Sequence, residues 1–113
     1  ADFVYIHVEA PDEMGHQGSV TNKIKAIEYL DDKVIKVVKK QMEDKGVDYR
    51  MLVMPDHPTP IRCRTHTSDP VPYLLYDSTD PLDKKWNYNE AEARNSGNVV
   101  EHGYEIINKL FER

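Results

Sequence analysis

The predicted fold depends first on residues 20–44, which have the sequence VTNKIKAIEYLDDKVIKVVKKQMED. Apolar side chains that recur every three or four positions form one face of an α-helix. In this stretch they are Ile24, Ile27, Leu30, Val34, Val38 and Met42. Ser19 or Thr21 is a suitable N-cap, and Gly46 lies just beyond the end, as is common after helices. The sequence therefore predicts one long amphipathic helix.

Two shorter stretches on either side of this helix have the composition of buried strands. Residues 3–9, FVYIHVE, are rich in β-branched and aromatic residues and end just before Pro11. Residues 49–54, YRMLVM, end at a loop that contains three prolines between positions 55 and 60. A strand, a long helix and a second strand in succession are typical of a parallel crossover unit, whose strands are buried on both faces.

The rest of the chain completes an α/β pattern. The expected elements are a third strand at residues 71–76, an exposed loop with Trp86 at 77–87, a short helix starting at 89–93 and a terminal helix at 101–111. A parallel sheet with the long helix packed on it indicates the α/β fold class, with three layers and at least three parallel strands. The 113 residues suffice for one core, and no second domain boundary is visible.

Composition narrows the possible partners of the chain. The formal net charge is −5 and no basic patch is present, which disfavours a nucleic acid or an anionic membrane as partner. The longest apolar stretches are strand-sized, well short of the roughly 20 residues of a membrane-spanning helix. One cysteine, Cys63, cannot form an internal disulfide. These features favour a cytoplasmic protein, and the start of the chain inside a predicted strand leads us to expect a fragment of a larger domain.

Acidic and imidazole side chains gather in the two loops that follow the first two predicted strands. Asp12 and His16 are separated by three residues in the loop expected at 11–18. Asp56 and His57 are adjacent in the second loop, with His66 nine residues further on. In open α/β sheets, ligands bind at the carboxyl ends of the strands, where these loops lie. Two carboxylates and three imidazoles suit Mn²⁺ or Zn²⁺ better than Ca²⁺.

Each of these pairs also has a simpler interpretation. An aspartate that caps a helix beside a solvated histidine is common, so spacing alone leaves a metal site and a structural role equally open. Thr67 and Ser68 lack a base placed by a motif, which argues against a nucleophilic role. We expect them instead to donate hydrogen bonds that orient His66 or Asp56. Cys63 has no second thiol beside it and is predicted to pack in the interior.

Three stretches around these residues resemble known motifs. They are residues 8–16, VEAPDEMGH, residues 54–60, MPDHPTP, and residues 64–72, RTHTSDPVP. In order and spacing they resemble the three C-terminal metal motifs of the archaeal-type cofactor-independent phosphoglycerate mutases, which belong to the alkaline phosphatase superfamily. The resemblance extends over almost the whole chain. It implies a three-layer, alkaline-phosphatase-like core with a mainly parallel sheet, of which residues 1–113 form the C-terminal part.

The resemblance implies ligands for two divalent cations, Mn²⁺ or Zn²⁺. Asp12, His16 and His66 would bind one ion, and Asp56 and His57 would contribute to the other. In this family a serine takes the phosphoryl group and returns it to another hydroxyl of the same glycerate, which interconverts 3- and 2-phosphoglycerate in glycolysis and gluconeogenesis. That serine and the arginines that bind phosphoglycerate lie upstream of these motifs. We therefore expect no catalytic residue within the chain and no activity from it alone.

Two other functions fit the same motifs. One is a different phosphotransferase of the superfamily, such as a homoserine kinase-like enzyme, because the metal motifs do not distinguish substrates. The other is an α/β module that binds metal without catalysis. Pro58 follows the pair Asp56-His57 where bacterial members of the family carry glycine, so this loop is more similar to the archaeal-type enzymes. An upstream domain that bears the serine would separate an enzyme from a binding module.

Overall fold

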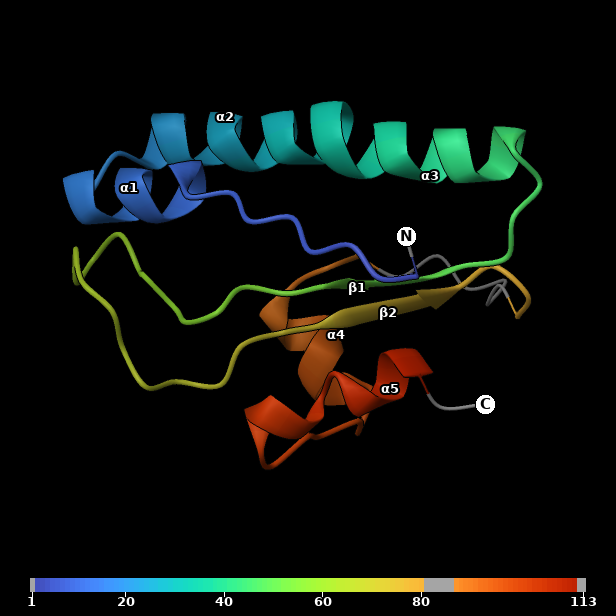
Figure 1. The fold of residues 1–113 in the computed structure, drawn as a ribbon. Helices are drawn as coiled ribbons and strands as arrows, with labels where there is room; N and C mark the ends of the chain where they lie inside the picture. Colours follow the sequence, from blue (N-terminus) through green and yellow to red (C-terminus); the bar gives the residue numbers. More distant parts are fainter. Residues whose placement is uncertain (1, 81–86, 112–113) are drawn as a thin grey trace. The chain divides into compact units, whose positions relative to one another are not determined.

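The computed structural model describes residues 2–80 and 87–111 of the 113 residues (Figure 1). Its elements in chain order are α1 (Ala10–Gln17), α2 (Val20–Leu30), the π-helix η1 (Asp31–Ile35), α3 (Lys36–Asp44), β1 (Arg50–Val53), β2 (Leu74–Asp77), α4 (Glu90–Asn95), the 3-10 helix η2 (Gly103–Glu105) and α5 (Asn108–Phe111). The chain divides into two compact units. The first unit contains the described residues of 1–45 and 57–69, and the second unit contains those of 46–56 and 70–113.

The predicted long helix is confirmed as three consecutive elements, α2, η1 and α3, which run without a break from Val20 to Asp44. Ser19 is its N-cap, and the side-chain oxygen accepts a hydrogen bond from the backbone N–H of Asn22 at 3.3 Å. Gly46 follows the last turn with a φ of 65°, in the left-handed region that glycine favours. The apolar spacing gave no indication of the π-helical segment η1. Among the described residues, no helix is long and apolar enough to cross a membrane.

The segment around α1 corrects two expectations. Residues 2–9 lie in no helix or strand, so the strand predicted at 3–9 is wrong for the described chain. A strand forms only where a second backbone pairs its N–H and C=O groups, and the described chain supplies no such pairing for these residues. Residues 11–18, predicted as a loop, belong mostly to the helix α1. Pro11 lies in the first turn of α1, where its missing N–H is not needed.

The sheet of the second unit consists of β1 and β2, which correspond to the strands predicted at 49–54 and 71–76. The two strands pair antiparallel, so the parallel arrangement predicted for them is wrong. The antiparallel register places opposite charges side by side, and Nε of Arg50 donates a hydrogen bond to Oδ2 of Asp77 at 3.0 Å. Cα partners across the pair are Arg50 and Asp77, Met51 and Tyr76, Leu52 and Leu75, and Val53 and Leu74. The described chain is a mixed α/β structure without the predicted three-layer parallel sheet.

The C-terminal part of the second unit is less helical than predicted. α4 starts where a helix was expected, and Oδ1 of Asn89 caps it by accepting a hydrogen bond from the N–H of Glu92 at 2.8 Å. Residues 101–111 form only the 3-10 helix η2 and α5 instead of one helix, and Gly103, which has a low α-helix propensity, lies at the start of η2. Residues 81–86 of the predicted loop, with Trp86, lie outside the described residues.

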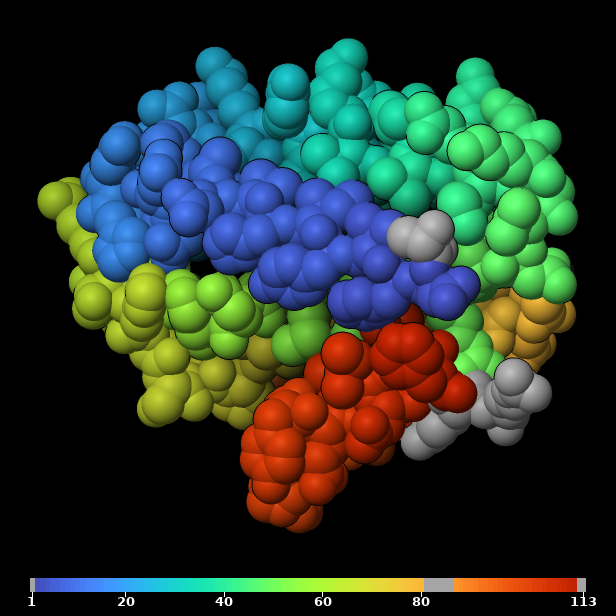
Figure 2. All heavy atoms as spheres, viewed as in Figure 1, coloured from blue at the N-terminus to red at the C-terminus, as the bar shows by residue number. Residues whose placement is uncertain are grey.

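Large apolar side chains are mostly exposed in both units. Ile106 of the second unit, at 8% exposure, is the sole large apolar residue classed as buried in the part of the chain that the structure describes. In the first unit, the N-terminal segment drawn in blue lies open at the surface (Figure 2), with Val4 69% and Tyr5 75% exposed. Ile24 and Ile27 of the predicted apolar stripe are about half exposed, at 51% and 50%. Exposed apolar surface of this extent is typical of a surface that other protein covers.

Candidate metal centre

The helix α1 places the side chains of Asp12 and His16 one turn apart on the same face. Oδ2 of Asp12 lies 3.3 Å from Nε2 of His16, four residues further along the chain. Asp12 and Glu13 lie in the first turn, where negative charge interacts favourably with the helix dipole. Gly18 ends the helix with a φ of 68°, and its N–H bonds the carbonyl oxygens of Gly15 and Met14. The i, i+4 geometry of a helix, rather than a turn, therefore brings the two side chains together.

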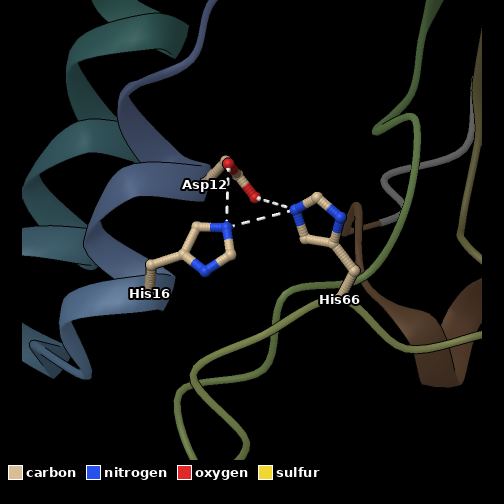
Figure 3. Close-up of side chains that lie close together, drawn as sticks. All are labelled: Asp12, His16 and His66. Atoms are coloured by element: carbon tan, nitrogen blue, oxygen red, sulfur yellow. Dashed lines mark hydrogen bonds and ion pairs between the residues drawn. The ribbon is translucent and has the colours of Figure 1, made fainter.

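The loop of residues 57–69 brings the third side chain, His66, to this face of α1. Nε2 of His66 lies 3.2 Å from Oδ1 of Asp12 and 3.1 Å from Nε2 of His16 (Figure 3). One ligand atom from each residue lies within 4.8 Å of the other two. The side chains remain 35%, 41% and 48% exposed for Asp12, His16 and His66 respectively, so an ion could reach them from solvent.

The backbone of the same loop orients the ring of His16. Nδ1 of His16 lies 3.0 Å from the carbonyl oxygen of Arg64, which only accepts hydrogen bonds, so Nδ1 carries the proton. In the neutral ring Nε2 then presents its lone pair toward Asp12 and His66. Arg64 has a φ of 53°, unusual for a residue with a side chain, and its N–H bonds the carbonyl oxygen of Pro60. The backbone carbonyl of this turn therefore fixes the orientation of the His16 ring on α1.

The charge of Asp12 is stabilised by its surroundings. The hydrogen bond from the Thr59 hydroxyl lowers the pKa of Asp12, and the nearby His16, His66 and His57 lower it further, while partial desolvation acts in the opposite direction. Asp12 is therefore ionised at neutral pH. Both of its oxygens are directed at an imidazole nitrogen, Oδ1 at His66 and Oδ2 at His16.

Thr59 is a site residue that the sequence analysis missed. It is only 6% exposed, and its hydroxyl donates a hydrogen bond to Oδ1 of Asp12 at 2.6 Å. The same oxygen lies 3.3 Å from Nδ1 of His57. Its position two residues after His57, within the motif at 54–60, was the one available indication. A threonine in a proline-rich loop gives no indication of which side chain its hydroxyl will contact.

The contacts of the remaining predicted site residues do not test the roles predicted for them. The ring of His57 stacks on that of His66, with centroids 3.5 Å apart. Asp56 is exposed and belongs to the second unit, so its pairing with His57 as a ligand stays a prediction. The Thr67 hydroxyl donates to Oδ2 of Asp69 at 2.9 Å, and Ser68 lies exposed on the same loop. The roles predicted for Thr67 and Ser68 beside His66 or Asp56 also stay predictions.

Cys63 of the same loop is exposed, so the prediction that it packs in the interior is wrong. Its N–H bonds the carbonyl oxygen of Pro60 at 3.0 Å, in the turn that also contains Arg64. The cysteine is turned outward because this turn lies at the surface of the first unit.

The donor set of the site fits a divalent cation. One carboxylate and two imidazoles are ligands that Zn²⁺ and Mn²⁺ share. Two ligand atoms bound tetrahedrally to one ion at about 2.1 Å lie about 3.4 Å apart. The three closest separations among Asp12, His16 and His66 are 3.1, 3.2 and 3.3 Å, near this value. Two imidazole nitrogens this close also repel each other unless a proton or a cation lies between them.

Comparison with known proteins identifies a family to which the chain belongs and several relatives. A family model described as the metalloenzyme superfamily matches residues 1–110. A probable 2,3-bisphosphoglycerate-independent phosphoglycerate mutase of Geobacter sulfurreducens is 45% identical over 113 residues, which cover 99% of this chain and 28% of that protein. The 2,3-bisphosphoglycerate-independent phosphoglycerate mutase of Methanothrix thermoacetophila is 41% identical over 110 residues, covering 97% and 28%. That of Sulfurisphaera tokodaii is 36% identical over 111 residues, covering 97% and 26%.

The chain thus spans little more than a quarter of the length of these relatives, 28% or 26%. No solved structure matches it.

Proposed function

The chain belongs to the metalloenzyme superfamily, and from this premise we propose that it is the metal-binding C-terminal portion of a cofactor-independent phosphoglycerate mutase. The observation that carries the proposal is the convergence of Asp12, His16 and His66, whose ligand atoms lie within 4.8 Å of one another. The similarity to phosphoglycerate mutases of bacteria and archaea supports the same assignment.

In this proposal Asp12, His16 and His66 hold one divalent cation, and both Mn²⁺ and Zn²⁺ match the donor set. Asp56 and His57 contribute to a second ion, as the motifs imply. When bound, such ions neutralise phosphoryl oxygens and lower the pKa of a bound hydroxyl. The chain itself keeps the carboxylate of Asp12 ionised and the ring of His16 oriented, so the ligands need little rearrangement to receive an ion.

For the longer protein we propose the interconversion of 3- and 2-phosphoglycerate through a phosphoserine, with phosphoglycerate as partner and the cytoplasm as location. The serine and the arginines that bind the substrate would lie outside residues 1–113. The three-layer core with a mainly parallel sheet would be completed by the same additional part. The exposed apolar residues of the N-terminal segment, among them Val4 at 69% and Tyr5 at 75%, support such a covering part.

The activity test compares the chain with the longer protein. The chain alone should not interconvert 3- and 2-phosphoglycerate, because it holds no nucleophile in this scheme. In the longer protein, replacing both His16 and His66 by alanine should lower kcat/KM by roughly a thousandfold, since a metal ion supplies about 4 kcal/mol of charge stabilisation.

His102 gives a matched control for this experiment. Its ring stacks on Tyr104 in the second unit, with centroids 5.5 Å apart, so His102→Ala should leave the activity unchanged. Turnover by the chain alone, or full activity in the double variant, would contradict the proposal.

A further inference from the structure

We propose that Thr59 is a positioning residue that fixes the carboxylate of Asp12 for metal binding and links it to His57. This inference rests on the function proposed above, because it assumes that Asp12 binds an ion. It follows from a threonine hydroxyl that lies between an aspartate on α1 and a histidine on the loop of residues 57–69.

The donor and acceptor in each of the two hydrogen bonds of the Thr59 hydroxyl can be assigned. The hydroxyl has one hydrogen, which it donates to Oδ1 of Asp12 at 2.6 Å, so it can only accept from Nδ1 of His57 at 3.3 Å. In the neutral ring of His57, a proton on Nδ1 leaves the lone pair on Nε2. Asp12 and His57 belong to the ligand sets proposed for two different ions. Thr59 therefore orients one ligand of each set through a single side chain.

The backbone of Thr59 is held in place by α1 and α2. Its carbonyl oxygen accepts a hydrogen bond from Nζ of Lys23 on α2 at 2.7 Å. Thr59 also packs on Gly15 of α1, where an added Cβ would lie 2.5 Å from the carbonyl oxygen and 2.9 Å from Cγ2 of Thr59. With Cγ2 against Gly15, the stiff side chain of threonine directs its hydroxyl toward Asp12.

Thr59 is nearly buried beside a more exposed aspartate. Thr59 is 6% exposed and the Asp12 side chain is 35% exposed, so their hydrogen bond is less open to competition from water than that of a surface hydroxyl. Oδ1 of Asp12 can accept through a second lone pair, and Nε2 of His66 lies 3.2 Å from the same oxygen. The hydrogen bond from Thr59 therefore leaves acceptor capacity on Oδ1 for an ion.

Thr59→Val tests this role because valine keeps the shape of threonine and removes the hydroxyl. The affinity of the 113-residue chain for Mn²⁺ and for Co²⁺ alone is measured by calorimetric titration. The affinity of Thr59→Val should fall about 10- to 100-fold, the usual effect of losing a residue that orients a metal ligand. Thr59→Ser should restore it. The visible absorption of the Co²⁺ complex should change in Thr59→Val and return in Thr59→Ser, since it reports the ligand geometry.

Thr79 provides a control with the same chemistry in the second unit. Its hydroxyl also donates to an aspartate, Oδ1 of Asp77, at 2.6 Å. Thr79→Val removes a charge-assisted hydrogen bond of the same kind at an exposed position outside the candidate site, and it should leave both affinities unchanged. This control shows the effect of losing a hydrogen bond from threonine to aspartate as such, whereas positioning of Asp12 affects only Thr59→Val.

The outcomes separate this inference from the function on which it rests. Equal metal affinity in Thr59→Val and the wild-type chain would overturn the role of Thr59 while leaving the metal site intact. Absence of metal binding by the wild-type chain would overturn the metal site and this inference together. If Thr59→Val lowers the Tm of the metal-free chain, Lys23→Met tests the same position with the hydroxyl retained. Weaker affinity in Lys23→Met supports the role of Thr59, and unchanged affinity contradicts it.

Discussion

Replacing Gly15 by alanine should disturb the metal site through Thr59. Gly15 is buried in α1, and a Cβ there would lie 2.5 Å from the carbonyl oxygen of Thr59, whereas ordinary van der Waals contact begins at 3.4 Å. Relieving the contact requires Thr59 and α1 to separate by about 0.9 Å, the difference between 3.4 and 2.5 Å. Because Asp12 lies on α1, such a separation would stretch the 2.6 Å hydrogen bond from Thr59 to Asp12 by up to the same amount and weaken it.

Two opposing effects set the change in the free energy of unfolding of Gly15→Ala. Alanine is favoured over glycine inside a helix by roughly 1 kcal/mol. Forcing an extra methyl group into a packed site typically costs about 1–3 kcal/mol, and weakening a hydrogen bond to a charged group adds to this cost. We expect a net loss of about 1–2 kcal/mol in the free energy of unfolding. Metal affinity should fall about tenfold or more, as for other losses of a contact that orients a ligand.

Urea denaturation measures the stability of Gly15→Ala, and calorimetric titration with Mn²⁺ measures its affinity. Gly103→Ala is the matched control, because an added Cβ there meets no described atom within 4 Å. The control should bind Mn²⁺ as the wild-type chain does. A Gly15→Ala chain that gains about 1 kcal/mol of stability and binds Mn²⁺ unchanged would refute the contact between Gly15 and Thr59.

Two further predictions concern the stability of the chain at low pH and the substitution Arg64→Gly. The hydrogen bond from Thr59 lowers the pKa of Asp12 below its usual 3.8. A lowered pKa in the folded chain stabilises it above the unfolded value, and this contribution is lost as pH falls through the folded value. Urea titrations below about pH 4 should therefore show a steeper loss of stability in the wild-type chain than in Asp12→Asn, and equal slopes would contradict the account. Arg64→Gly should raise the free energy of unfolding by roughly 1 kcal/mol, because a φ of 53° is unfavourable for arginine. It should leave Mn²⁺ affinity unchanged, because His16 bonds the backbone carbonyl, and weaker binding would instead implicate the side chain.

Sequence reasoning succeeded where structure depends on near neighbours. The long helix from Val20 to Asp44 was predicted because its spacing, N-cap and following glycine all lie within a few residues of one another. Sequence reasoning failed where the structure of a segment depends on pairing with residues far away in the sequence. Residues 3–9 have the composition of a strand, yet the described chain supplies no second strand to pair with them. β1 and β2 were predicted individually, but their antiparallel direction depends on which strands meet, and composition does not encode that.

The residues of the candidate site were likewise predicted only in part. Asp12 and His16 are four residues apart, and this spacing left a metal site and a structural role equally open until the resemblance of the motifs favoured the metal site. A helix rather than a turn brings the two side chains into contact. His66 joined them because its motif follows in the expected order. Thr59 was missed because a hydroxyl has many possible partners, and only the packing of its loop on Gly15 directs it at Asp12.

X-ray diffraction from crystals of the chain grown with Zn²⁺, measured on both sides of the zinc absorption edge, tests the central claim most directly. The anomalous difference map locates the ion independently of any assumption about its ligands. The account predicts a peak about 2.0–2.2 Å from a carboxylate oxygen of Asp12 and from Nε2 of both His16 and His66. A zinc peak bound elsewhere, or Asp12, His16 and His66 without an ion in zinc-saturated crystals, would contradict it.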